Sequence, residues 1–187
     1  MTLLLTLIAQ GPTLATRQAS FPSDEPLLDD KQPSVSTSSW RSRKVLSSPK
    51  IACLQTAQLL GLNAEVDHEL RDLDFGNWSG LSLTEVAQHN PEAMERWISD
   101  AAFDGHGGES RECMSRRMAG WLDQIKEADE HVVAVTHSAL IKTLVMTVLN
   151  APAPAFWSID IGPATVCDFR HDGRRWALRS LGCPLPA

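Results

Sequence analysis

One histidine and two carboxylates stand at places in the chain where a fold could present them to a ligand. His137 comes just past the apolar stretch 132–135, Asp72 follows Arg71, and Glu109 follows two glycines. Imidazole and carboxylate groups are the side chains that most often move protons in catalysis. Each residue also has a structural interpretation. His137 can be a hydrogen-bonded strand-end residue, Asp72 a local cap or ion-pair partner, and Glu109 a carboxylate favoured at a helix N-terminus.

The remaining histidines and the cysteines do not form the pattern of a metal site or of a disulfide scaffold. The cysteines contain no CxxC pair and are far apart in the sequence. They are Cys53, Cys113, Cys167 and Cys183. The histidines without ligand spacing to a cysteine or carboxylate are His68, His89, His106 and His131. We therefore expect no metal ion and no cofactor, and buried thiols in a reducing cytoplasm.

Length and charge narrow the class of protein. The 187 residues predict one domain spanning 1–187. With 17 Lys and Arg against 23 Asp and Glu, the formal net charge is −6. An acidic chain without a long basic run argues against binding to nucleic acid or to an anionic membrane surface. It leaves room for a local basic pocket that takes a small phosphorylated molecule.

The first half of the chain predicts strands separated by a long loop and a helix. Residues 3–8 indicate a buried strand rather than a signal peptide, because no basic residue precedes them. A long loop with at most one short helix should follow. The next expected elements are a strand at 45–48, a helix at 49–60 closed by Gly61, and a short strand at 65–70.

The second half predicts helices and a closing hairpin. Ser82 to Glu85 has the form of a capping box, and Pro91 favours the start of another helix. The longest helical pattern has one apolar side, made of Cys113, Met114, Met118, Trp121, Leu122 and Ile125. A strand at 132–135, a helix at 140–149, an extended segment at 158–161 and a hairpin of 165–170 with 176–180 complete the chain. This alternation predicts a three-layer α/β/α sandwich with a mostly parallel central sheet.

Several motifs, in their order along the chain, resemble the histidine phosphatase (phosphoglycerate mutase-like) superfamily, and within it the small phosphatase branch. An apolar strand leads into the stretch Ala9 to Thr13, at the place of the family's Arg-His-Gly-Glu-Thr. The other matching motifs are Asp24 to Leu27, Ser47-Ser48-Pro49 with Gln55-Thr56-Ala57, Leu70 to Leu81, Gly107 to Ser110, and Val135 to Ser138. The resemblance implies the same α/β/α fold.

The resemblance also implies a chemistry and assigns its slots. In the family a neutral histidine attacks a phosphoryl group, two arginines and a second histidine stabilise its oxygens, and a carboxylic acid protonates the leaving oxygen. By position, the nucleophile slot holds Gln10 and the two arginine slots hold Ala9 and Ala52. The acid falls on Asp72 and the second histidine on His137. Glu109 matches the family as well, and Thr13 and Arg17 belong to the loop over the expected pocket.

These substitutions favour a pseudoenzyme. An amide nitrogen has no available lone pair, so Gln10 cannot form a phosphoenzyme. The leading hypothesis is an inactive or impaired homologue that binds a small phosphorylated or anionic ligand, or a partner. The alternative is an active phosphomonoester hydrolase of the α-ribazole phosphatase kind, in which His137 and Asp72 activate water. That alternative needs replacement cations, for which Arg17, Arg41, Arg43 and Lys50 are the candidates. A third interpretation is a protein–protein interaction module, which a stable homodimer in solution would favour.

Overall fold

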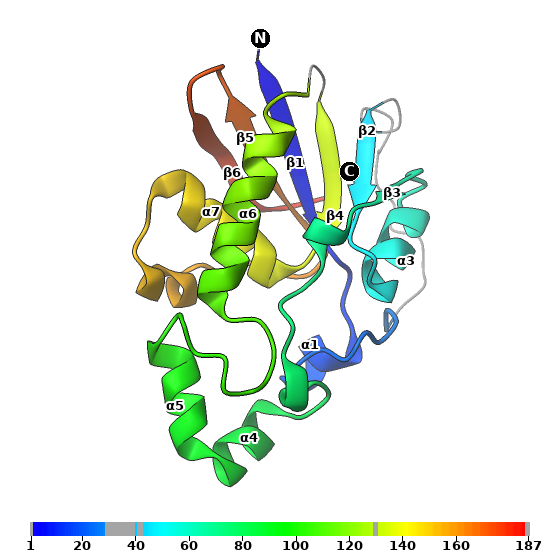
Figure 1. Ribbon diagram of the computed structural model, residues 1–187. Coiled ribbons are helices and arrows are strands. Elements are labelled where there is room, and N and C mark those ends of the chain that lie inside the picture. The colour runs from blue at the N-terminus through cyan, green and yellow to red at the C-terminus, as the bar shows by residue number, and fades with distance from the viewer. Residues whose placement is uncertain (1, 29–39, 41–42, 129–130, 186–187) are drawn as a thin grey trace.

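A six-stranded sheet forms the centre of the molecule (Figure 1), whose computed structural model describes residues 2–28, 40, 43–128 and 131–185. The strand order is β3-β2-β4-β1-β5-β6. The strands are β1 (Leu3–Ala9), β2 (Lys44–Ser47), β3 (Glu65–Val66), β4 (Val132–Thr136), β5 (Thr165–His171) and β6 (Trp176–Pro184). The pairs from β3 to β1 are parallel, whereas β5 joins β1 and β6 in antiparallel fashion.

Helices cover both faces of this sheet, which confirms the three-layer architecture. Helices α6 (Arg111–Ile125) and α7 (Ser138–Leu149) lie on one face, and α3 (Ile51–Leu59) lies on the other (Figure 1). Alternate residues of β4 enter two separate apolar cores, as strand geometry requires. Val132 and Ala134 pack in the core under α6 and α7, while Val133 and Val135 pack in the core under α3.

The remaining helices lie beyond the carboxyl ends of the parallel strands (Figure 1). They are α1 (Leu14–Gln18), α4 (Leu83–His89) and α5 (Pro91–Ser99). The capping box of α4 forms as expected between Ser82 and Glu85, and Pro91 begins α5. Gly61 follows α3 with φ of 65°, a conformation that favours glycine. None of the described helices is both long enough and apolar enough to cross a membrane.

Three local expectations were wrong or only partly right. The expected strand at 65–70 stops at Val66, because the Asp67 side chain accepts the amide of Glu69 and starts a 3-10 turn (His68–Leu70). The expected extended segment at 158–161 contains no strand, since Ser158 ends a 3-10 helix (Ala153–Ser158) and the next three residues form no ladder.

The third correction concerns the cysteines. Cys113 and Cys183 are exposed, so only Cys53 and Cys167 are the buried thiols that were expected. Cys113 therefore does not belong to the apolar side of α6. The short helix that was expected in the first loop is present as α1, and residues 29–39 of that loop fall outside the described part of the chain.

Candidate functional site

Three polar residues meet where the central parallel strands end. Gln10 follows β1, Ser48 follows β2 and His137 follows β4. Backbone hydrogen bonds continue the sheet into these positions, because the Gln10 amide donates to Thr136 O (2.8 Å) and the Ser48 amide to Val135 O (2.9 Å). In open α/β sheets the crevice at the carboxyl ends of the strands is where ligands bind.

A fourth segment brings Asp72 to the same edge. The Thr136 hydroxyl donates to the carbonyl of Leu70 (2.9 Å), which ties the segment before Asp72 to the end of β4. On the other side Arg117 of α6 donates to the carbonyls of Glu69 and Arg71. Arg117 is itself held by Glu109 in a two-pronged ion pair, with Nη2 2.7 Å from Oε2 and Nε 2.9 Å from Oε1. Glu109 thus acts on the site through Arg117.

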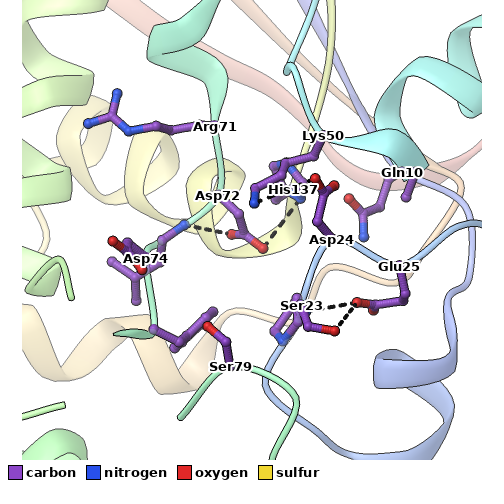
Figure 2. Close-up of a pocket in the computed structure, with 14 residues that line it drawn as sticks. Gln10, Ser23, Asp24, Glu25, Lys50, Arg71, Asp72, Asp74, Ser79 and His137 are labelled. Atoms are coloured by element: carbon purple, nitrogen blue, oxygen red, sulfur yellow. Dashed lines mark hydrogen bonds and ion pairs between the residues drawn. The ribbon is translucent and has the colours of Figure 1, made fainter. Parts of the chain in front are cut away.

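These segments enclose a cavity of about 340 Å³ (Figure 2). Its volume is at the lower end of the range for small-molecule sites. The second histidine and the acid that the family resemblance assigns, His137 and Asp72, both line it. The lining residues are Gln10, Pro22, Ser23, Asp24, Glu25, Lys50, Ala52, Arg71, Asp72, Leu73, Asp74, Phe75, Ser79 and His137.

His137 is the most buried titratable group of the cavity wall, with 4% of its surface exposed. Its Nε2 shares a hydrogen bond with the Ser48 hydroxyl (2.8 Å), and its Nδ1 lies 3.3 Å from Asp72 Oδ2 without the alignment of a hydrogen bond. Burial lowers the pKa of the imidazole, which the charge of Asp72 only partly opposes and that of Lys50 reinforces. The start of α7 at Ser138 also disfavours a cation here. His137 is therefore neutral at pH 7.

Asp72, His137 and Ser48 follow one another in the order of a Ser-His-Asp triad. A nucleophile must touch its substrate, however, and the Ser48 side chain is fully buried and does not line the cavity. Ser48 is consequently a buried hydrogen-bond partner that fixes the imidazole ring, and Asp72 lies beside the ring without a hydrogen bond to it. Ser48 also accepts a hydrogen bond from the Lys50 amide (3.3 Å), which fixes the start of α3.

Gln10 and Cys53 are buried polar neighbours of the His137 ring. The Cys53 thiol donates to Gln10 Oε1 (3.4 Å) and lies 3.4 Å from His137 Nε2. Burial raises the pKa of this thiol well above its usual range, and the nearby charge of Asp72 adds to the effect. The thiol is thus protonated and unreactive at neutral pH.

Acidic side chains outnumber basic ones around the cavity. The carboxylates belong to Asp24, Glu25, Asp72 and Asp74, and the cations to Lys50 and Arg71. Lys50 Nζ lies 3.9 Å from Asp24 Oδ2. The guanidinium of Arg71 points away from the other polar groups in Figure 2 and lies within 4.0 Å of Glu69 and Glu109, outside the cavity.

The structure brings together some of the residues expected at the site and separates others. Gln10, Ala52, Asp72, His137 and the candidate cation Lys50 line the cavity. The residues that do not line it are Ala9, buried at the end of β1; Thr13, which caps α1; Arg17, exposed on α1; and Glu109. Arg43 precedes β2 at the end opposite Ser48, and Arg41 lies outside the described residues.

Sequence reasoning did not single out several groups that shape the cavity. Glu25 and Arg71 each belong to a motif that had been identified, Asp24 to Leu27 and Leu70 to Leu81, but neither was given a role there. Ser48 likewise lies inside the Ser-Ser-Pro motif. Arg117 carried no signal, because its task depends on Glu109 and on a segment distant in sequence.

Comparison with known proteins gives a family match over most of the chain. Residues 35–184 match the family model described as histidine phosphatase superfamily, branch 1. A Mycobacterium tuberculosis protein described as bifunctional is 33% identical over 137 residues, which cover 69% of this chain and 38% of that relative. The match therefore spans about two fifths of that relative's length.

Two further likenesses concern a named phosphatase and a solved structure. The glucosyl-3-phosphoglycerate phosphatase of Mycobacterium tuberculosis is 29% identical over 136 residues, covering 67% of this chain and 59% of that protein. The structure of Bacillus stearothermophilus YhfR superposes with a TM-score of 0.85 at 21% identity, over 97% of both chains. At that identity the structural likeness shows the shared fold alone.

Proposed function

The chain belongs to the histidine phosphatase superfamily, and we propose that it is a catalytically inactive or severely impaired member whose cavity binds a small ligand. The observation that carries the proposal is Gln10, which lines the cavity in the slot that the family resemblance gives to the nucleophilic histidine. Its side-chain nitrogen is an amide and cannot become phosphorylated in the manner of an imidazole.

The expected losses in turnover support a severe impairment, and the other groups of the cavity do not compensate for them. Loss of a nucleophile has cost on the order of 10⁶ in turnover in a well-studied enzyme. Loss of one stabilising donor costs about 10²–10³. Ala9 and Ala52 occupy the two arginine slots, so two such donors are missing as well. Neither of the two cavity cations compensates, since Lys50 is near Asp24 and Arg71 is directed toward Glu69 and Glu109.

The charge of the cavity restricts the ligand. A phosphorylated or anionic ligand was expected from the sequence, but four carboxylates face two cations around this space. Two like charges 4 Å apart repel by about 4 kcal/mol at an effective dielectric constant near 20. A phosphate dianion would meet that repulsion at each nearby carboxylate. We therefore include in the proposal that the ligand is not a phosphate ester.

A hydrolase with a rebuilt site is the second candidate. The observation that favours it is the neutral His137 beside Asp72, a pair able in principle to take a proton from water. That reaction on a phosphomonoester still needs cations at the phosphoryl oxygens. Among the described residues, Lys50 is the one of the four candidate cations that lines the cavity. This candidate therefore ranks second.

A cytoplasmic location is part of the same proposal. It is supported by the cysteines, which are all free thiols in the described structure, two of them exposed. Exposed free thiols are typical of proteins that stay in a reducing compartment.

A phosphatase screen tests the proposed function. Wild type and His137→Ala should be assayed side by side against a broad set of phosphomonoesters, and thermal unfolding should establish that both samples are folded. We expect neither protein to exceed the uncatalysed background. Saturable turnover by the wild type that disappears in His137→Ala would overturn the proposal and favour the rebuilt hydrolase.

A further inference from the structure

The wall of the cavity at Asp74 is held by a loop that does not itself line the cavity. This α5–α6 loop (residues 100–110) joins α5 to α6 and packs against the segment that follows Asp74. The amide of Asn77 donates to the carbonyl of His106 (2.8 Å). The amide of Glu109 donates to the carbonyl of Asp74 (2.8 Å). Two backbone hydrogen bonds therefore attach this part of the wall to the loop.

The packing between the loop and the wall leaves no space for a side chain. A methyl group at Gly76 would overlap the carbonyl oxygen of His106. A methyl group at Gly108 would overlap the carbonyl oxygen of Asp74. Backbone lies directly against backbone at both places, and atoms packed this closely transmit a displacement to their neighbours. A movement of the loop at Gly108 therefore moves the wall at Asp74.

The side chain of His106 fixes the conformation of the loop at Gly108. Its Nδ1 accepts a hydrogen bond from the amide of Gly108 (3.0 Å). A backbone amide nitrogen only donates, so this bond assigns the ring proton of the neutral imidazole to Nε2. The residue is 1% exposed, and its Nε2 has no hydrogen-bond partner in the described part of the chain. The loop thus holds His106 as one defined tautomer.

A second proton can enter this ring at Nδ1 alone, and that atom already accepts a hydrogen bond. An imidazolium donates from both of its nitrogens. Protonated His106 would therefore turn an N–H group toward the N–H group of Gly108, and two donors that face each other repel. The hydrogen bond to Gly108 and a proton on Nδ1 exclude each other.

The surroundings of the ring determine when the proton binds. Three aromatic rings surround His106, and the centroid distances are 5.2 Å to Trp78, 5.8 Å to Phe103 and 6.5 Å to Phe75. Burial lowers the pKa of His106, and the negative charges of Asp74 in the wall and Asp104 in the loop oppose this lowering. His106 is therefore neutral at pH 7 and binds its second proton in acid.

We infer that His106 is a positioning residue of the cavity wall, and that a proton on its Nδ1 releases the amide of Gly108 and with it the wall at Asp74. His106 needs no contact with a ligand for this effect, because it acts through the backbone of the loop. The inference goes beyond the proposed function, since it concerns the shape of the cavity whichever ligand occupies it.

Nitrogen-15 NMR of the wild type follows both the proton and the loop. At neutral pH the imidazole of His106 should show the tautomer with its proton on Nε2. Between about pH 7.5 and 5, protonation of His106 should coincide with shifts of the Asp74 and Asn77 amides. The Gly108 amide should then exchange at least about tenfold faster, after correction for the intrinsic pH dependence of amide exchange. The amide of Val133 in the central strand β4 should stay protected, which excludes global unfolding.

Two variants separate the hydrogen bond of His106 from its titration. His106→Asn places a side-chain oxygen near the position of Nδ1, so it accepts the Gly108 amide and does not titrate. We expect it to keep Gly108 protected and to remove the pH-dependent shift at Asp74. His106→Phe removes the acceptor, so Gly108 should be unprotected already at neutral pH. His89→Asn removes an exposed histidine of α4 and should retain the wild-type behaviour of Gly108.

Three results with the wild type would overturn the inference. They are a proton on Nδ1 at neutral pH, protonation of His106 with Gly108 still protected, and an imidazole that stays neutral down to about pH 5. A wild-type pH dependence at Asp74 in His106→Asn would overturn it as well. None of these results bears on the nucleophile slot at Gln10. The proposed loss of phosphatase chemistry is tested separately by turnover, so the two proposals can fail independently.

Discussion

His137 Nδ1 lies 3.3 Å from Asp72 Oδ2, yet burial and not this carboxylate decides the charge of the histidine. A close carboxylate raises the pKa of an imidazole, and burial lowers it. Here the lowering effect is the larger one, and Lys50 adds to it. The imidazole of His137 is therefore neutral at pH 7 in spite of the acidic side chain beside it.

The lowered pKa of His137 predicts that the protein loses stability in mild acid. Between the folded pKa and the unfolded value near 6.5, the unfolded chain binds a proton that the folded chain refuses. The free energy of unfolding therefore falls as the pH drops below about 6.5, by up to about 1.4 kcal/mol per pH unit for each such group. Burial also lowers the pKa of His106 and His131, so these add to the effect. Urea unfolding from pH 7.5 to 5 measures the slope.

Two variants measure how much of this pH dependence of the free energy of unfolding comes from His137. His137→Gln should make the slope shallower by about one proton, even if the variant is less stable at pH 7. His68→Gln, which removes an exposed histidine outside the cavity, is the control for loss of an imidazole. An unaltered slope in His137→Gln would show that its folded pKa is not depressed.

The ion pair of Glu109 with Arg117 predicts a large cost for removing one partner. Their side chains are 13% and 6% exposed. Glu109→Gln leaves the Arg117 guanidinium uncompensated and should lower the free energy of unfolding by about 3 kcal/mol. The double variant Glu109→Leu with Arg117→Met should cost less than the sum of Glu109→Leu alone and Arg117→Met alone. Urea unfolding of the wild type, these two single variants and the double variant completes the cycle, and strict additivity would contradict a coupled pair.

The close packing around Gly108 predicts that a larger side chain there is destabilising, and Gly120 provides the control position. A methyl group at Gly108 would overlap the Asp74 carbonyl oxygen and lie 2.8 Å from the Gly76 amide nitrogen, both backbone atoms. Gly108→Ala should therefore destabilise by about 2 kcal/mol or more and disturb the cavity wall at Asp74. Gly120→Ala meets no atom within 4 Å at its exposed position on α6 and should stabilise by about 0.5–1 kcal/mol. Thermal and urea unfolding distinguish the two, and equal effects would contradict this account.

Local signals were sufficient for much of the fold. The capping box at Ser82, the proline at Pro91 and the apolar strands predicted elements that the structure contains, because those features act within a few residues. The strand expected at 65–70 is shorter than predicted, and a local interaction is again the cause. The Asp67 side chain bonds its own backbone two residues on, and that local bond competes with a sheet ladder.

The cavity was less predictable, because its character depends on contacts between distant segments. The motifs pointed to Gln10, Asp72 and His137 as neighbours, and the structure places all three on one wall. The acidic balance did not follow from the motifs. It arises because the segments around Glu25 and Asp72 bring their carboxylates to one cavity, and the guanidinium of Arg71 points instead toward Glu109, 38 positions further along the chain. Pairings at such separations leave no period or spacing in the sequence.

The most direct test of the central claim restores the missing groups. Wild type and the triple variant Ala9→Arg, Gln10→His, Ala52→Arg should be compared for phosphomonoester turnover and for trapped phosphohistidine after a single turnover. We expect background turnover and no phosphohistidine in the wild type, and both phosphomonoester turnover and phosphohistidine in the restored protein. Phosphomonoester turnover by the wild type that equals or exceeds that of the restored protein would contradict this expectation.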